Sequence, residues 1–210
     1  RGLAGLDSSG RTETLECIFG IRTRKDGIIS LDGQPCFNRS AGESIKNGFA
    51  LLTEERRATG IFGGLSIREN TVISSLKRHL RFGLYLSEKT QREDTQHYID
   101  AMRTKTPSQE TKIRTLSGGN QQKVIIGRWL LTEPEVLLLD EPTRGIDVGA
   151  KYEIYRLIHE MADQGKAVIL VSSELPELLG MSARIYTSCE GNITGEIDSK
   201  DANQEKLMRL

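Results

Sequence analysis

Two nearby stretches of this 210-residue chain carry residues suited to binding and cleaving a phosphate anhydride. The first, Leu116 to Lys123, reads Leu-Ser-Gly-Gly-Asn-Gln-Gln-Lys and opens a predicted helix that runs through Trp129. The free amides and positive dipole of a helix start suit a phosphate group. The second, Leu137 to Pro142, is an apolar strand ending in Asp140 and Glu141, which could hold Mg²⁺ and polarise an attacking water. Each stretch is weak evidence alone, but together they predict a nucleotide site.

A glycine-rich loop near the start of the chain adds a third stretch. It follows a predicted strand and fits the pattern G-x-x-x-x-G-K-[ST] at Gly5, Gly10 and Thr12, with Arg11 in the lysine position. In such a loop the backbone amides wrap the phosphates, the lysine reaches the outer ones, and the hydroxyl binds Mg²⁺. Arg11 keeps the charge, but its planar fork is bulkier. An ordinary strand-to-helix turn is the alternative; the downstream stretches favour an altered phosphate loop.

Composition limits the classes of partner. The 29 basic and 29 acidic residues balance, so net charge favours neither nucleic acid nor an anionic membrane surface. A basic cluster at Lys77 to Arg81 is interpreted as a solvated face and not a nucleic-acid patch, because aromatic residues are not interleaved with it. The longest aliphatic run, Ala167 to Val171, is far shorter than the ~20 residues of a spanning helix.

Cysteine usage points away from a disulfide framework and a zinc site, and histidine usage points away from catalysis by histidine. Three cysteines lie far apart in the sequence: Cys17, Cys36 and Cys189. Their odd number and wide spacing are typical of reduced thiols. Three histidines fall in charged, helical stretches and are interpreted as surface or half-buried residues: His79, His97 and His159. The chain lacks an initiator Met and an export leader, and we expect it to be a piece of a longer protein.

The first half of the chain predicts two inserted regions. Alternation over 26–33 predicts a hairpin, and 48–53 a further short strand, so residues 20–60 are expected to form a small antiparallel β subdomain. From residue 66 the apolar residues are mostly spaced by three, four or five, and residues 66–115 are expected to form a helical subdomain.

The second half alternates helix and strand. Residues 150–164 predict an amphipathic helix, 167–171 a buried strand, and 184–197 a strand, a turn at Gly191 and a second strand. This order predicts an α/β fold with a parallel core in one domain, residues 1–210.

These motifs, taken together, resemble the nucleotide-binding domain of ATP-binding cassette (ABC) proteins over nearly the whole chain. The resemblance implies a P-loop NTPase (RecA-like) core with an antiparallel β subdomain and an inserted α-helical subdomain. More narrowly, Thr53 to Arg57, Asn120 and Pro142 to Gly149 resemble the C-terminal cassettes of monosaccharide importer ATPases. The galactose/methyl-galactoside type is the most similar, and the ribose type comes next.

The resemblance also implies roles for residues. ATP and Mg²⁺ would be the ligands, and two cassettes would pair head to tail. Glu141 would be catalytic, and Thr12 and Asp140 would bind the metal. The nucleotide would be contacted by a wider set: Gly5, Gly10, Arg11, Thr12, Ser117, Gly118 and Gly119.

In such a pair, the residues Ser117 to Gly119 would touch nucleotide held mainly by the partner cassette, and Gly145 and Asp147 would link the two sites. The family implies membrane permease subunits and a periplasmic or extracellular sugar-binding protein as further partners. It also implies a peripheral location on the cytoplasmic face of the cell membrane.

Three positions depart from the cassette pattern, and all belong to the chain's own ATP site. Arg11 replaces lysine, Glu54 replaces glutamine, and Ser173 replaces the histidine that contacts the γ-phosphate. We therefore expect slow or no hydrolysis at this site, with an intact Ser117 to Gly119 serving the partner. The segment Glu54 to Leu65 is expected to meet the permease.

Two rival functions remain open. One is a non-transport ABC ATPase, such as a translation or DNA-repair factor, although those typically keep the loop lysine. The other is a regulatory module in which nucleotide only joins two cassettes. A Rossmann dehydrogenase is disfavoured because the loop lacks the G-x-G-x-x-G spacing.

Overall fold

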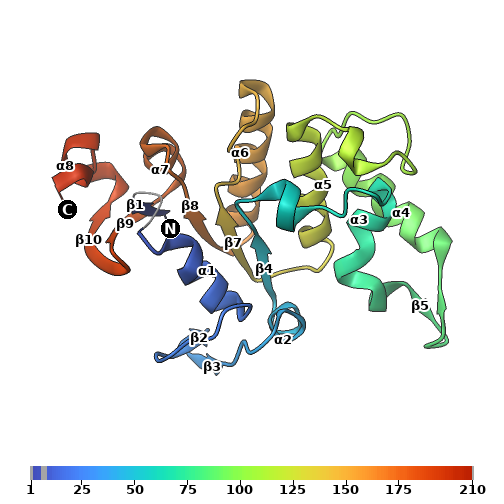
Figure 1. Cartoon of the computed structure of the whole chain (residues 1–210), viewed down its shortest axis with the longest axis horizontal. Helices are drawn as coiled ribbons and strands as arrows, with labels where there is room; N and C mark the ends of the chain where they lie inside the picture. The colour runs from blue at the N-terminus through green and yellow to red at the C-terminus, as the bar shows by residue number, and fades with distance from the viewer. Residues whose placement is uncertain (1, 6–8, 210) are drawn as a thin grey trace. The chain divides into compact units, whose positions relative to one another are not determined.

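A computed structural model of the protein describes residues 2–5 and 9–209 (Figure 1). The chain divides into two compact units. We call Arg1–Glu54, Glu135–Pro142 and Leu157–Leu210 the core unit, and Glu55–Pro134 with Thr143–Arg156 the helical unit. Among the described residues, no helix is long and apolar enough to cross a membrane.

The core unit is built on a six-stranded sheet with the order β10-β9-β1-β8-β7-β4. Every neighbouring pair is parallel except β9 and β10, which are antiparallel around the turn at Gly191. This confirms the expected α/β fold with a parallel core. The strands are β1 (Gly2–Gly5), β4 (Phe49–Leu52), β7 (Val136–Asp140), β8 (Ala167–Val171), β9 (Arg184–Cys189) and β10 (Asn192–Asp198).

One strand belongs to a different sheet from the one expected. We assigned residues 48–53 to the antiparallel β subdomain, and that assignment is wrong: β4 pairs parallel with β7, with Leu51 opposite Leu138. All four residues of β4 are buried, as in a strand covered on both faces. Antiparallel pairing within residues 20–60 is confined to β2 (Ile29–Leu31) and β3 (Gln34–Cys36).

Helices of the core unit pack apolar faces against this sheet. Helix α1 (Arg11–Phe19) buries Leu15 and Phe19, and α7 (Leu175–Met181) begins with Pro176 in its first turn, where its missing N–H costs no helical hydrogen bond. Two further helices are α2 (Ala41–Lys46) and α8 (Gln204–Arg209), with a 3₁₀ turn, η4 (Ser199–Asp201), before the last. Helix α6 (Val148–Asp163) begins in the helical unit and ends in the core unit.

The helical unit has its own small apolar core, formed by Ile67, Ile113 and Val124. A capping box between Ser66 and Glu69 fixes the start of α3 (Ile67–Val72). Its other elements are the π turn η1 (Arg56–Gly60), the 3₁₀ segments η2 (Ile73–His79) and η3 (Ile113–Thr115), strands β5 (Leu80–Arg81) and β6 (Tyr85–Leu86), and helices α4 (Glu88–Ala101) and α5 (Gly118–Leu130).

Two features of this unit differ from expectation. A β-hairpin, β5–β6, interrupts the helical pattern, because Phe82 and Gly83 adopt left-handed backbone conformations with φ of 52° and 70°. His79, expected at the surface or half-buried, is 1% exposed. Its Nδ1 lies 3.3 Å from the hydroxyl of Thr90 in α4, so helix packing buries it.

Candidate nucleotide-binding site

The sheet topology gathers the predicted own-site residues at one edge of the core unit. Strands β1, β8, β7 and β4 are successive parallel neighbours, so their carboxyl ends meet at the same edge (Figure 1). In such sheets this edge is where ligands bind. The residues that follow these four strand ends include Gly10 to Thr12, Ser172 and Ser173, Glu141, and Glu54; Asp140 is the last residue of β7.

The start of α1, at Arg11, lies at this edge of the sheet. Gly10 precedes the helix with φ of 86°, a conformation that favours glycine. The carbonyl of Ser9 accepts hydrogen bonds from Gly191 N at 3.0 Å and from the Ser188 hydroxyl at 2.8 Å, which anchor the end of the loop to β9 and β10. Residues Leu6 to Ser8 of the predicted phosphate loop lie outside the described residues.

Arg11 points into the site and is 5% exposed. Its Nη1 donates to the carbonyl of Ser172 at 3.1 Å and lies 3.9 Å from Glu141 Oε1. The guanidinium is therefore already engaged by two groups of the site. Sequence reasoning missed Ser172, since a backbone carbonyl leaves no signal in the residue type.

Asp140 and Thr12 lie together and fit the chemistry of a Mg²⁺ site. Burial raises the pKa of Asp140, whereas a hydrogen bond from Thr12 lowers it. Oδ1 of Asp140 is buried and has no hydrogen-bond partner within the described part of the chain. No group of three or more His, Cys, Asp and Glu side chains in that part could hold a metal. Mg²⁺, however, usually takes one or two protein ligands beside water and phosphate, which a single carboxylate with a hydroxyl can supply.

Glu141 follows Asp140 in a left-handed conformation, with φ of 47°. Its N–H donates to the carbonyl of Val171 at 2.9 Å, which fixes it beside β8. Burial raises the pKa of Glu141, while hydrogen bonds from Ser173 and the charge of Arg11 lower it. The structure thus brings Arg11, Glu141 and Ser173 together. Glu54 is half-buried and follows β4, the strand that pairs with β7.

The predicted signature, Ser117 to Gly119, forms the start of α5 in the helical unit. Ser117 is exposed, and its hydroxyl accepts from Asn120 Nδ2 at 3.0 Å. Oδ1 of Asn120 in turn accepts from Lys105 N at 2.9 Å. These two hydrogen bonds hold the serine hydroxyl in one orientation at the start of the helix, where a phosphate group could bind.

Gly119 is needed because the loop of Gly145 to Asp147 packs directly on it. A Cβ at Gly119 would lie 2.7 Å from Cβ of Ala150 and 3.3 Å from Ile146. Asp147 Oδ1 accepts from Ala150 N at 3.0 Å and so caps α6, which starts beside the signature. The signature and this loop therefore form one packed structure within the helical unit.

A second contact joins the signature to the segment Glu54 to Leu65. Arg56 Nε donates to Gln121 Oε1 at 3.3 Å, and a Cβ at Gly118 would lie 2.9 Å from Arg56 Nη2. Gln121 Nε2 donates to the carbonyls of Ile113 and Leu116, at 3.2 and 3.1 Å. Arg56 thus lies against the first turn of α5, at the positions predicted to touch nucleotide.

Arg128, in the last turn of α5, binds the C-terminal part of the segment Glu54 to Leu65. It is 5% exposed and donates to the carbonyls of Gly60 at 2.8 Å and Asn70 at 2.6 Å. Burial lowers the pKa of Arg128 to about 10. Phe62 N donates to Asn70 Oδ1 at 2.9 Å, and the Arg128 guanidinium lies 5.6 Å from the Phe62 ring centroid. The sequence analysis missed this contact, although a lone arginine among the apolar residues of α5 indicates a buried, hydrogen-bonded side chain.

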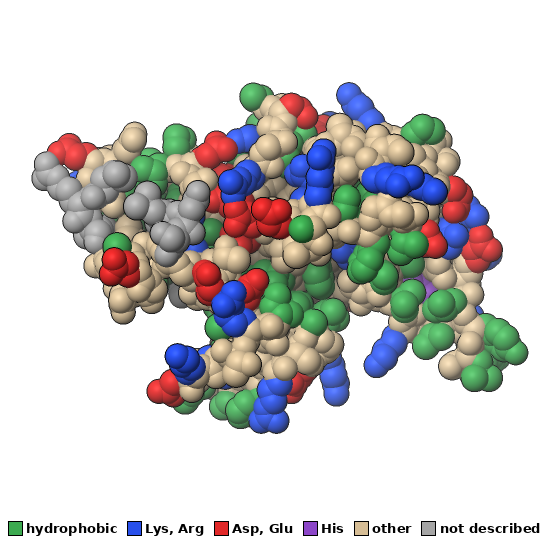
Figure 2. Space-filling view, in the orientation of Figure 1, with side chains coloured by type: hydrophobic (Ala, Val, Ile, Leu, Met, Phe, Trp, Pro, Cys, Tyr) green, Lys and Arg blue, Asp and Glu red, His purple; other side chains and the backbone are tan. Residues whose placement is uncertain are grey.

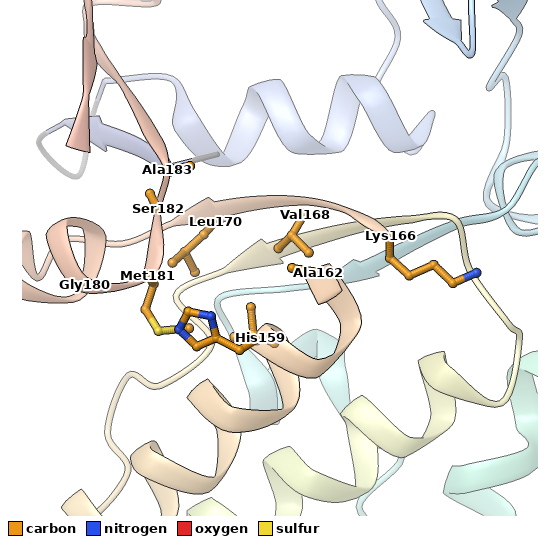
Figure 3. Close-up of a pocket in the computed structure, with 10 residues that line it drawn as sticks. His159, Ala162, Lys166, Val168, Leu170, Gly180, Met181, Ser182 and Ala183 are labelled. Carbon is orange, nitrogen blue, oxygen red and sulfur yellow. The ribbon is translucent and has the colours of Figure 1, made fainter. Parts of the chain in front are cut away.

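Described residues of the core unit line two cavities that bear on the site. One, of about 360 Å³, is lined by α6, β8 and the turn before β9 (Figure 3). Its walls are largely apolar, and Lys166 at its rim points away to bond Glu135 at 2.9 Å. The other, of about 420 Å³, borders Gly10 and the first turn of α1. The second cavity lies where the predicted phosphate loop begins its helix; the first lies along β8 and α6.

Comparisons with known proteins identify the family of the chain. A family model described as "ABC transporter" matches residues 1–144. The "Galactose/methyl galactoside import ATP-binding protein MglA" of Mannheimia succiniciproducens is 54% identical over 209 residues, covering 100% of this chain and 41% of the relative. Its namesake from Fusobacterium nucleatum is 56% identical over 209 residues, with 100% and 42% covered. The chain therefore spans about two fifths of the length of these relatives.

Solved structures share the fold. A dimeric ATP-binding cassette in a post-hydrolysis state, bound to ADP and Pi, matches with a TM-score of 0.79 and 21% identity, covering 94% of this chain and 84% of that one. A nucleotide-free cassette from an ABC transporter matches with a TM-score of 0.80 and 18% identity, covering 99% and 82%. With the sequence matches over the whole chain, these findings place the protein in the ABC transporter family, as an ATP-binding cassette.

Proposed function

We propose that this cassette couples ATP binding and hydrolysis to the import of galactose, methyl galactoside or a closely similar monosaccharide. Support comes from the identity above 50% that the whole chain shares with import ATP-binding proteins of that name. In this proposal the protein sits on the cytoplasmic face of the cell membrane. Its partners are a second cassette, the permease subunits and, through them, a sugar-binding protein.

The own-site residues have defined roles in the proposal. The amides at the start of α1 bind the phosphates, and Thr12 and Asp140 hold Mg²⁺ beside them. When bound, Mg²⁺ neutralises charge that develops on the transferred phosphoryl group. Glu141 orients and polarises the attacking water, and its anionic form is favoured by Ser173 and Arg11.

We further propose that this site hydrolyses ATP slowly or not at all. The contact that carries the idea is that of Arg11 with Glu141 and the Ser172 carbonyl. Because these two groups hold the Arg11 guanidinium, it is less free to reach the outer phosphates than a lysine would be. Its positive charge also makes the Glu141 carboxylate a weaker base. Ser173 cannot supply the imidazole contact to the γ-phosphate, and Glu54 would add negative charge near it.

The signature, by contrast, departs from the cassette pattern at none of its three residues, Ser117 to Gly119. Ser117 is exposed, its hydroxyl is oriented by Asn120, and Gly119 admits close packing. We propose that Ser117 to Gly119 complete the ATP site of the partner cassette. The pair would then be asymmetric, with one active site and one mainly structural site.

The segment Glu54 to Leu65 is the proposed surface for the permease. Arg56 and Arg128 attach this segment to both ends of α5, whose first turn carries the signature. A displacement of the segment would therefore be transmitted to Ser117 through the helix. The exposed Arg57 is the residue we propose to contact the permease, because Arg56 is occupied by Gln121.

The test is made in the full two-cassette protein assembled with its permease. Ser117→Arg should abolish transport-coupled ATP hydrolysis, because the bulky cation blocks the partner's phosphate site. Arg11→Ala should cost far less. Equal losses would contradict the asymmetry. The isolated 210-residue chain should bind ATP weakly and turn it over negligibly, and robust hydrolysis by that chain would also contradict the proposal.

A further inference from the structure

The β5–β6 hairpin leaves an apolar surface uncovered. Every residue from Leu80 to Leu86 is exposed, and Phe82, Leu84 and Tyr85 are 95%, 78% and 70% exposed. Figure 2 shows hydrophobic side chains gathered over the tip of this hairpin, at the lower right of the view. A two-stranded hairpin exposed on both faces is marginally stable alone, so a covering surface would stabilise it.

The turn of the hairpin places the aromatic side chain of Phe82 at its tip. Leu84 N donates to the carbonyl of Arg81 at 3.1 Å, which closes the turn. Phe82 stands at the turn with φ of 52°, a left-handed conformation that bulky residues rarely adopt. The side chain of Phe82 therefore projects from the tip into solvent, followed closely by those of Leu84 and Tyr85.

The charged residues within the hairpin segment are all basic. From Leu76 to Ser87 the chain carries three basic residues and no acidic one, although the whole chain is neutral. Arg78 is paired with Asp94 at 3.2 Å and with Glu133 at 2.6 Å, whereas Lys77 and Arg81 are exposed. The nearest acid on the following helix, Glu88, is paired with Arg92 at 2.7 Å. The apolar tip thus carries a net positive border.

We propose that this hairpin docks on an anionic lipid surface, with Phe82 and Leu84 inserted among the headgroups and Lys77 and Arg81 bound to lipid phosphates. Aromatic and leucine side chains beside cations are the combination that favours a membrane interface. A second copy of the chain fits poorly, because two basic hairpins repel.

This contact goes beyond the proposed import function and needs neither sugar nor ATP turnover. The test is co-flotation of the purified chain with vesicles of phosphatidylcholine, with and without 30% phosphatidylglycerol, in low and high salt. We expect binding to the anionic vesicles only, weakened by salt. Phe82→Ser and Arg81→Glu should each weaken this binding about tenfold.

Matched controls make equivalent changes on the core unit. Ile28→Ser removes an apolar side chain that is 86% exposed, and Lys25→Glu makes the same charge reversal as Arg81→Glu. Both should bind vesicles like the unmodified chain, and all four variants should keep its circular dichroism spectrum. The proposal fails if the chain does not bind anionic vesicles, or if the controls lose as much binding as the hairpin variants. It also fails if Phe82→Ser only abolishes self-association.

Discussion

The guanidinium of Arg11 lies 3.9 Å from the carboxylate of Glu141, and both side chains are about 95% buried. These two residues stand at the two positions expected to hold phosphate and to activate water, so the cation and the proposed general base would constrain each other. Breaking one half of a buried pair leaves the other charge uncompensated. The free energy of unfolding of the core unit should therefore depend on the interaction between these two side chains.

Arg11→Ala should lower the free energy of unfolding by about 1–3 kcal/mol, because it leaves the Ser172 carbonyl and Glu141 without their shared donor and cation. In the double variant with Glu141→Gln the loss should be smaller than the sum of the two single losses. Chemical denaturation of all four proteins measures this coupling. Strict additivity would show that the two side chains act independently.

Gly119→Ala should destabilise the helical unit by about 1–3 kcal/mol, because the new Cβ would lie 2.7 Å from Cβ of Ala150. Gly180→Ala is the matched control, since α7 leaves open space around that position. The control should be neutral or stabilising by up to about 1 kcal/mol, as expected of alanine in a helix. Thermal melts distinguish them, and equal effects of the two changes would refute the packing argument.

Arg56→Ala should loosen the first turn of α5, because Gln121 loses its donor and Gly118 loses the side chain that covers it. We expect faster hydrogen exchange of the Gln121 amide, which donates to the Ser117 carbonyl at 2.9 Å, and a loss of about 0.5–1.5 kcal/mol in the free energy of unfolding. The neighbouring Arg57→Ala, at an exposed position, should change exchange there little. Unchanged exchange in Arg56→Ala would mean that this contact does not hold the signature.

The sequence predicted the features that follow from local pattern. The apolar run before Asp140, the Gly191 turn and Pro176 in the first turn of a helix are each determined by residues close together in the chain. The spacing of the motifs also placed Asp140 and Glu141 at a strand end.

The errors and omissions concern contacts between distant residues. The four apolar residues of β4 do not specify which strand it pairs with, so the sequence alone could not identify β7 as its neighbour. The apolar spacing around Phe82 predicts a helix, but Phe82 and Gly83 adopt left-handed backbone conformations and the chain forms a hairpin there. Arg11 and Ser172 are 161 positions apart in the sequence, so no local spacing of residues predicts their contact.

Burial of His79 gives the helical unit an expected sensitivity to acid. Burial lowers the pKa of His79 below its ordinary 6.5; Asp94, 3.8 Å from Nδ1, opposes this shift and Arg78 adds to it. The unfolded chain therefore binds the proton more readily than the folded one. The neutral, folded form has its full stability above pH 6.5 and loses it as the pH falls from 6.5 toward the lowered pKa.

We expect the urea midpoint of the unmodified chain to fall between pH 7.5 and pH 5, and His79→Gln to flatten this part of the profile. Asp94→Asn should steepen it, because the carboxylate that favours protonated His79 in the fold is lost. His97→Gln is the control, as that imidazole is exposed. A profile unchanged by His79→Gln but flattened by His97→Gln would assign the acid sensitivity to the surface histidine.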